Sequence, residues 1–111
     1  MVVTLVELES GCAEQIARFF PEVRPAAMPA LLELRRSGGV KVREAIVIEF
    51  ASAEKAIFHS KLPLEFEDRV LIENDGGHGM AAKVIAVQYH DGRTAVAVQV
   101  LDGLFSWMTR P

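Results

Sequence analysis

The stretch that decides the fold runs from Phe66 to Leu101, FEDRVLIENDGGHGMAAKVIAVQYHDGRTAVAVQVL, and contains three strand patterns separated by two glycine-containing turns. In each pattern every second residue belongs to one face, which a strand can bury. These sets are Val70 and Ile72, then Ala82, Val84 and Ala86, then Thr94, Val96, Val98 and Val100. The pair Asp91-Gly92 tolerates the positive φ angles of a tight hairpin. We therefore predict a small antiparallel barrel or strongly curled sheet, with no helix across 81–100.

The period of two begins further upstream, at Val40. Between Val40 and Phe50 the apolar residues alternate with polar ones, which predicts a long strand. Residues 56–59 give a short strand, and Leu62-Pro63-Leu64 leads into a bend before Asp68. Residues 40–107 are thus predicted to form a barrel of five to seven strands.

The N-terminal part has a different pattern. Residues 2–9 are predicted to form a strand, and Ser10 is a candidate cap for a helix carrying Ile16, Phe19, Phe20 and Val23 at three- and four-residue spacing. A second helix is predicted to begin near Pro25 or Pro29, to carry Leu31 and Leu34, and to end with Arg35 and Arg36 before Gly38-Gly39. The predicted fold class is α+β, mainly β: a single domain over 1–111, with a helical extension over 1–39.

Composition limits the class of protein. A chain of 111 residues, half of them hydrophobic, is expected to fold as one domain. The net charge of −3 speaks against a nucleic-acid polymer as partner. Cys12 is the single cysteine, which excludes an intrachain disulfide. The apolar residues 2–6 lack the length and the basic start of a signal peptide or membrane span, so a cytoplasmic protein without membrane insertion is expected.

Two segments, SAEKAIFHSKLPLEFEDRVLIEN (52–74) and GHGMAAKVIAVQYHDGRTAVAVQVLD (77–102), resemble the PilZ domain. The similarity lies in the order of a polar turn and strand, a leucine-proline-leucine before the next strand, an AKVI strand, a hairpin, and an AVxVLD strand. An aromatic tail such as Phe105–Trp107 also occurs in some members. The resemblance implies a six-stranded barrel of a bacterial signalling protein.

The ligand motifs of that family are degraded in this chain. PilZ domains that bind cyclic di-GMP resemble one another in an RxxxR loop and a [D/N]xSxxG turn, which supply bidentate arginines and a hydroxyl. The first motif aligns only to the stretch from Arg35 to Gly39, with Gly39 in place of the second arginine. In the second motif Phe50 replaces the Asp or Asn, Lys55 replaces the glycine, and Ser52 alone is retained. Weak or absent binding of cyclic di-GMP is therefore expected.

No other cluster of residues indicates chemistry. His59, His78 and His90 do not have the spacing of metal ligands. The glycine loop 76–79 lacks the lysine and the following helix of a phosphate loop, and no serine has a recognisable base. We predict neither an enzyme nor a metal or cofactor site.

Two functions from different classes remain at this point. The first is an adaptor that contacts a protein partner or a second copy of itself through Leu31, Leu34, Phe105 and Trp107, although the leucines could instead be core and Trp107 a plug of the barrel. The second is a receptor for cyclic di-GMP or another nucleotide with a rearranged site. Its candidate ligand-binding residues are Arg35, Arg36, Arg43 and Ser52.

Overall fold

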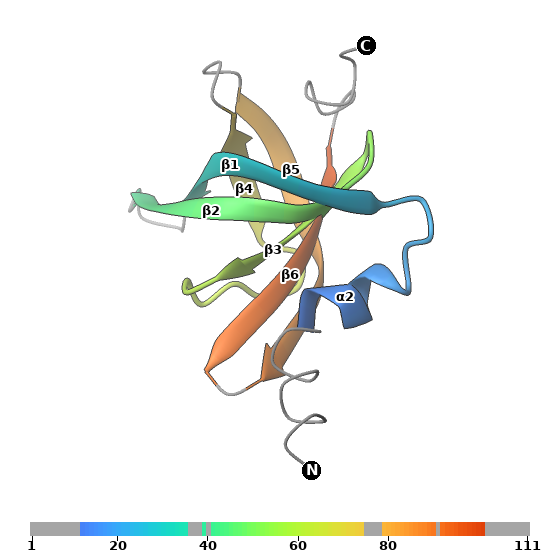
Figure 1. Ribbon diagram of the computed structural model, residues 1–111. Helices are drawn as coiled ribbons and strands as arrows, with labels where there is room; N and C mark the ends of the chain where they lie inside the picture. The colour runs from blue at the N-terminus through green and yellow to red at the C-terminus, as the bar shows by residue number, and fades with distance from the viewer. Residues whose placement is uncertain (1–11, 36–38, 40, 75–78, 91, 102–111) are drawn as a thin grey trace.

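The computed structural model describes residues 12–35, 39, 41–74, 79–90 and 92–101. Its elements are α2 (Cys12–Ala17), β1 (Arg24–Arg35), β2 (Lys41–Ala51), β3 (Lys55–Ser60), β4 (Arg69–Glu73), β5 (Gly79–His90) and β6 (Arg93–Val100). The six strands form a closed barrel in the order β1-β2-β3-β6-β5-β4, with every neighbouring pair antiparallel (Figure 1). The predicted antiparallel barrel of five to seven strands is confirmed, and no described residue between 81 and 100 is helical.

The prediction of a second N-terminal helix is wrong, because residues 24–35 form β1. Ala30, Leu32 and Leu34 point inward, with the period of two of a strand. The outward Leu31 adds an apolar residue three positions before Leu34, and this spacing resembles that of a helix. β1 pairs with β2 along its length but with β4 only across 31–34. Pro25 and Pro29 therefore lie where one edge of β1 has no described strand beside it, a position that tolerates a missing N–H.

The first predicted helix is confirmed in place but is shorter than expected. It spans only Cys12–Ala17, and Ala13 and Ile16 are buried. Phe19, which the helical spacing assigned to the apolar face, is 79% exposed. The predicted strand over 2–9 lies outside the described residues.

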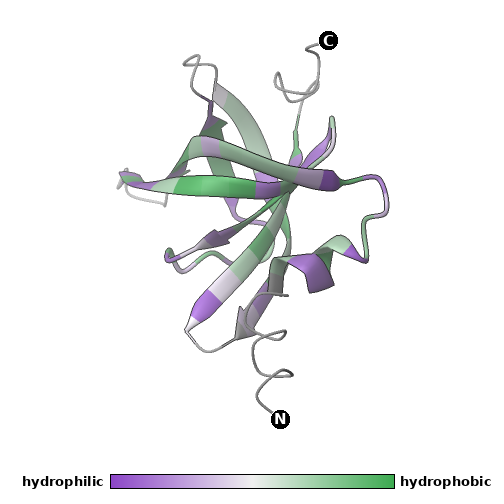
Figure 2. Ribbon diagram, in the orientation of Figure 1, coloured by the Kyte–Doolittle hydropathy of each residue, from purple (hydrophilic) through white to green (hydrophobic). Residues whose placement is uncertain are grey.

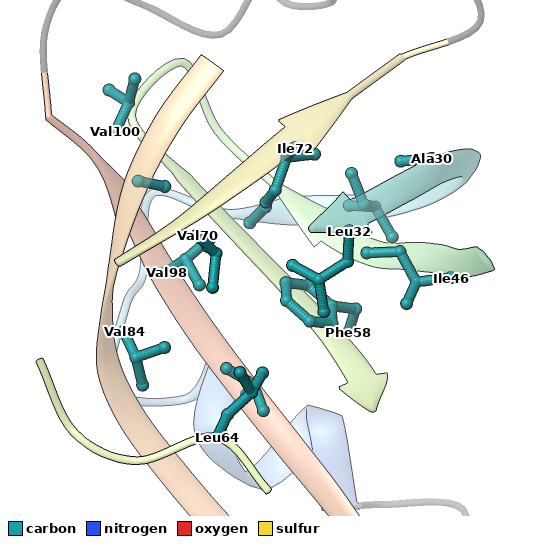
Figure 3. Packing of buried hydrophobic residues seen from close by; sticks show 14 of the residues in the cluster. Ala30, Leu32, Ile46, Phe58, Leu64, Val70, Ile72, Val84, Val98 and Val100 are labelled. Atoms are coloured by element: carbon teal, nitrogen blue, oxygen red, sulfur yellow. The ribbon is translucent and has the colours of Figure 1, made fainter. Parts of the chain in front are cut away.

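The inside of the barrel is filled by apolar side chains. Figure 3 shows Leu32, Ile46, Phe58 and Ile72 pointing toward one another from four different strands. Phe58 is the largest side chain that is completely buried. Figure 2 shows the corresponding hydrophobic middle and hydrophilic N-terminal end of β2 and β6. The burial of these apolar side chains supplies the hydrophobic driving force that closes the sheet into a barrel.

A β-bulge in β5 changes which residues face inward. Ala82 and Val84 lie in the barrel as predicted, but the register shifts between Val84 and Ala86. Val87 consequently packs against the interior, whereas Ile85 and Ala86 pack on the outer face under α2. The prediction that Ala86 shares the face of Val84 is thus wrong, because one extra residue reverses the alternation.

On β6 the predicted alternation is confirmed. Val96, Val98 and Val100 face the interior, while Ala95 and Ala97 face outward and form a second cluster with Ile16 of α2. The small alanine side chains allow the helix to lie close to the wall of the barrel.

Replacing Phe58 by alanine should lower the free energy of unfolding by about 3–5 kcal/mol, the usual loss for deleting a fully buried aromatic ring. Urea denaturation followed by circular dichroism measures this change. Phe66, which is 65% exposed, provides the matched control, and Phe66→Ala should stay within about 0.5 kcal/mol of the parent. Equal losses for the two variants would contradict the placement of Phe58.

Candidate functional site

β2 and β3 separate soon after the turn that joins them. Their paired residues are Ile48 with Phe58, Phe50 with Ile57, and Ala51 with Ala56, with a register shift between the first two pairs. Further toward Lys41, β2 has only β1 as a described neighbour (Figure 1). The space between the diverging strands is a recess of about 280 Å³ lined by residues 44–47, 49, 59–61 and 92–94.

A carboxylate bridges this recess at the end of the barrel. Glu44 of β2 accepts hydrogen bonds from the Ser60 hydroxyl at 2.6 Å and from the Lys61 N–H at 2.8 Å. The Ser60 oxygen in turn accepts the N–H of Leu62 at 3.0 Å. Ser60 and Thr94 are both buried, so polar side chains line the end of the barrel at this point.

A histidine lies on the outer side of the same recess. His59 Nδ1 is 2.5 Å from the Glu49 carboxylate, and its Nε2 is buried with no hydrogen-bond partner among the described residues. The carboxylate can only accept, so it holds the proton of a neutral imidazole on Nδ1. Ser60 is the next residue along β3 and points to the other face, where its hydroxyl is bonded to Glu44. The arrangement therefore does not give Ser60 a histidine base.

The predicted ligand-binding residues Arg43 and Ser52 are far apart. Arg43 lies near the start of β2 and Ser52 directly after its end, nine positions further along the chain, so extended geometry places their Cα atoms up to about 30 Å apart. Arg43 Nε is 2.9 Å from Glu33 Oε1, and the Glu33 side chain is only 5% exposed. The structure thus does not bring Arg43 and Ser52 into one site.

Arg35 belongs to the end of the β1–β2 hairpin that carries Arg43. Arg35 is the last residue of β1, and its Cα lies opposite that of Lys41. Arg36 lies outside the described residues. The hairpin register therefore places Arg35 beside the start of β2, whereas Ser52 follows the other end of that strand.

Ser52 has a structural role in the β2–β3 turn. Its oxygen accepts the N–H groups of Glu54 at 3.2 Å and Lys55 at 3.0 Å, and the residue is buried. A short side chain that satisfies turn N–H groups in this way favours a tight connection. The Ser52 oxygen thus accepts two hydrogen bonds inside the turn, and the residue is part of the turn structure.

Lys55, at the end of this turn, makes a charged contact that was not predicted from the sequence. Lys55 Nζ is 2.5 Å from Glu22 Oε2 and 5.7 Å from the centre of the Phe20 ring. The hydrogen bond from Lys55 is the main cause that lowers the pKa of Glu22 below its ordinary value. Lys55 is more than 30 positions further along the chain than Phe20 and Glu22, so no local spacing could have indicated this contact.

The predicted interface residues fall in different environments. Leu34 is only 3% exposed and belongs to the core, whereas Leu31 is half-buried on the outside of β1. Residues three apart in a strand point to opposite faces, so the two leucines do not form one stripe. Phe105 and Trp107 lie outside the described residues. Among the described residues, the large hydrophobic side chains that are exposed are Phe19, Val42, Val47, Phe66, Tyr89 and Leu101.

Among the described residues, no three His, Cys, Asp or Glu side chains are grouped so that they could hold a metal ion. His78, one of the scattered histidines, is outside this part of the chain. No described helix has the length and apolar character needed to span a membrane. No family model matches the sequence, and no curated protein matches it.

Ser52→Ala should lower the free energy of unfolding by about 1–2 kcal/mol, because two N–H groups of the turn lose their acceptor. Ala53→Ser places a hydroxyl at the next position and should change stability by less than about 0.5 kcal/mol. Urea denaturation of both variants measures the difference. An unchanged Ser52→Ala variant would show that the hydroxyl does not support the turn.

His59 should carry its proton on Nδ1 when the imidazole is neutral, because Glu49 accepts from that nitrogen. Long-range ¹H–¹⁵N correlation spectra of the imidazole nitrogens distinguish the two tautomers. Glu49→Leu should reduce the preference, whereas Glu65→Leu, at an exposed position, should leave it unchanged. A neutral ring protonated on Nε2 in the parent protein would contradict the pairing with Glu49.

Proposed function

We propose that this chain is a cytoplasmic, PilZ-like regulatory or adaptor domain that acts through protein–protein contacts rather than through catalysis or a bound nucleotide. The proposal is supported by the sequence resemblance together with the closed antiparallel barrel of six strands. The retained Ser52 lies in a turn between two strands, the kind of position that the second PilZ motif occupies.

The observation that carries the proposal is that Ser52 is separated from Arg35 and Arg43, which both belong to the other end of the β1–β2 hairpin. Arg43 lies near the start of β2 and Ser52 directly after its end. Arg43 contacts Glu33, and Ser52 accepts from the turn N–H groups. A cyclic dinucleotide requires several donors around one groove, because affinity depends on simultaneous hydrogen bonds to its phosphates and bases. A site in which Ser52 lies at the opposite end of the hairpin from Arg35 and Arg43 does not meet that requirement.

The packed interior also favours an external mode of action. Phe58, Leu32, Ile48 and Ile72 are completely buried within the barrel. A ligand cannot enter such a core without displacing close-packed side chains. A partner is therefore expected to bind on the outside or along an edge of the sheet.

Isothermal titration with cyclic di-GMP tests the proposal against the receptor alternative. We expect no sub-micromolar binding at physiological salt, since the loss of one charge-assisted hydrogen bond alone costs about 1.5–3 kcal/mol, or roughly one to two decades of affinity. Arg43→Met and Ser52→Ala should not change the titration curve. Sub-micromolar binding that these variants weaken would establish the receptor instead.

Affinity capture from cells that produce the protein tests whether the chain binds a protein partner. The intact chain should retain a defined protein partner, and added cyclic di-GMP should not change the amount retained. Retention of no protein above the level of an unrelated small β-barrel, across several growth conditions, would contradict the adaptor function.

A further inference from the structure

Four basic residues form a cross-strand row on the barrel. Arg35 of β1 is paired with Lys41 of β2, and Arg69 of β4 is paired with Lys83 of β5. The ladder between β1 and β4 ends at the residues next to Arg35 and Arg69, which places these two at one level. The four residues, called the basic row below, thus cross the neighbouring strands β2, β1, β4 and β5 (Figure 1).

The positions of the basic row belong to the outer surface of the barrel. The residues next to the row on β1, β4 and β5 are core residues, and side chains alternate between the two faces of a strand. Lys41 and Arg69 are exposed, and Lys83 is half-buried. None of these three forms an ion pair with a described acid.

The register sets like charges directly opposite one another in two places. Arg35 is opposite Lys41 and Arg69 is opposite Lys83, and such pairs destabilise an antiparallel ladder. An acid at one position of each pair would have removed the repulsion, but the row contains none. An anion lying along the row offsets the same repulsion when it binds, so the unbound barrel favours an anionic ligand here.

The acids near the basic row lie at its border. Arg43 Nε is 2.9 Å from Glu33 Oε1 in the adjacent row, so this pair adds no net charge. Glu65 and Glu67, in the turn before β4, are exposed and form no ion pair with the described cations of the row. Asp68 accepts the Glu65 N–H in that turn. A surface that is basic along the row and acidic beside it favours a short anionic segment over a long polyanion.

We propose that the basic row binds a short acidic segment of a partner protein, which runs across the strands. The inference rests on the proposed adaptor function and specifies its site and the chemistry of the partner. Neighbouring strands are about 4.8 Å apart, so the four positions extend over about 14 Å. A single phosphate group is too small to contact all four cations, whereas a run of glutamates or aspartates supplies a carboxylate at every residue.

The shape of the barrel argues against a membrane or a nucleic-acid duplex as the occupant. The row crosses four of the six strands of a closed barrel, so its two ends point in different directions. A flat bilayer or a stiff duplex contacts only part of a curved row, while a flexible acidic chain can follow it. The net charge of −3 also opposes the approach of a long polyphosphate.

An NMR titration with acetylated hexaglutamate tests the site. At low salt, the amide signals of residues 41–43, 69–71 and 81–83 should shift in a saturable way, whereas those of α2 should not. One molar salt should weaken the binding at least tenfold, because it screens exposed charges. Acetylated hexalysine should cause no such shifts.

Lys83→Glu separates binding from folding. It should weaken hexaglutamate binding about tenfold, because a cation is lost and an anion is gained in the row. Its Tm should equal or exceed that of the parent, since Arg69 then has an acid opposite it. The matched control is Arg24→Glu, an exposed cation at the other end of β1 from Arg35, which changes the net charge equally and should leave the affinity within about twofold.

Four results would overturn the inference. They are absent shifts at saturating hexaglutamate, equal losses of affinity in Lys83→Glu and Arg24→Glu, a Tm of Lys83→Glu below that of the parent, and tighter binding of anionic phosphatidylglycerol vesicles or a single-stranded hexanucleotide that Lys83→Glu weakens. The last result would assign the row to phosphate groups.

The outcome is distinguishable from that of the adaptor function. Failure here together with successful capture of a protein partner would leave the adaptor function standing at another surface. Failure of the capture alone would refute the adaptor function and not the ability of the basic row to bind acids.

Discussion

The short ladder between β2 and β3 is the constraint on which the rest of the structure depends. Only three residue pairs join these strands, yet they close the barrel. Phe58 is paired at the point where the ladder ends, and its ring fills the interior just where backbone pairing stops. Ser52 holds the turn that starts the ladder, and Glu44 spans the gap beyond it. The recess lies where β2 follows β1 instead of continuing beside β3.

The sequence predicted the inward face correctly wherever the larger apolar side chains recur at every second position without interruption. The faces of β3, β4 and β6 follow directly from a period of two. β1 was missed for a physical reason: Leu31 occupies an outward position, and the prolines that suggested a helix start lie instead along a partly unpaired edge. The bulge in β5 could not be anticipated either, because a single added residue leaves no mark in composition.

The candidate site shows a second limit of prediction from the sequence. The contacts of Glu33 with Arg43 and of Glu22 with Lys55 join strands and loops that only the folded topology brings together. The separation of Arg43 and Ser52, however, was implicit in the sequence. Once residues 40–50 are predicted to be extended, the rise per residue already places the two side chains at opposite ends. Periodicity thus predicts which residues cannot meet more reliably than which residues do.

The position of α2 has a consequence for how the chain is made. The helix rests on β3, β5 and β6, and Gln15 is bonded to Gln88, 73 residues later in the chain. The first described element to leave the ribosome therefore has no completed docking surface until the β5–β6 hairpin has been synthesised. Such a short helix is marginal without tertiary support. During translation the growing chain can form its early β1–β2 hairpin. α2, in contrast, can dock only after β5 and β6 have been synthesised.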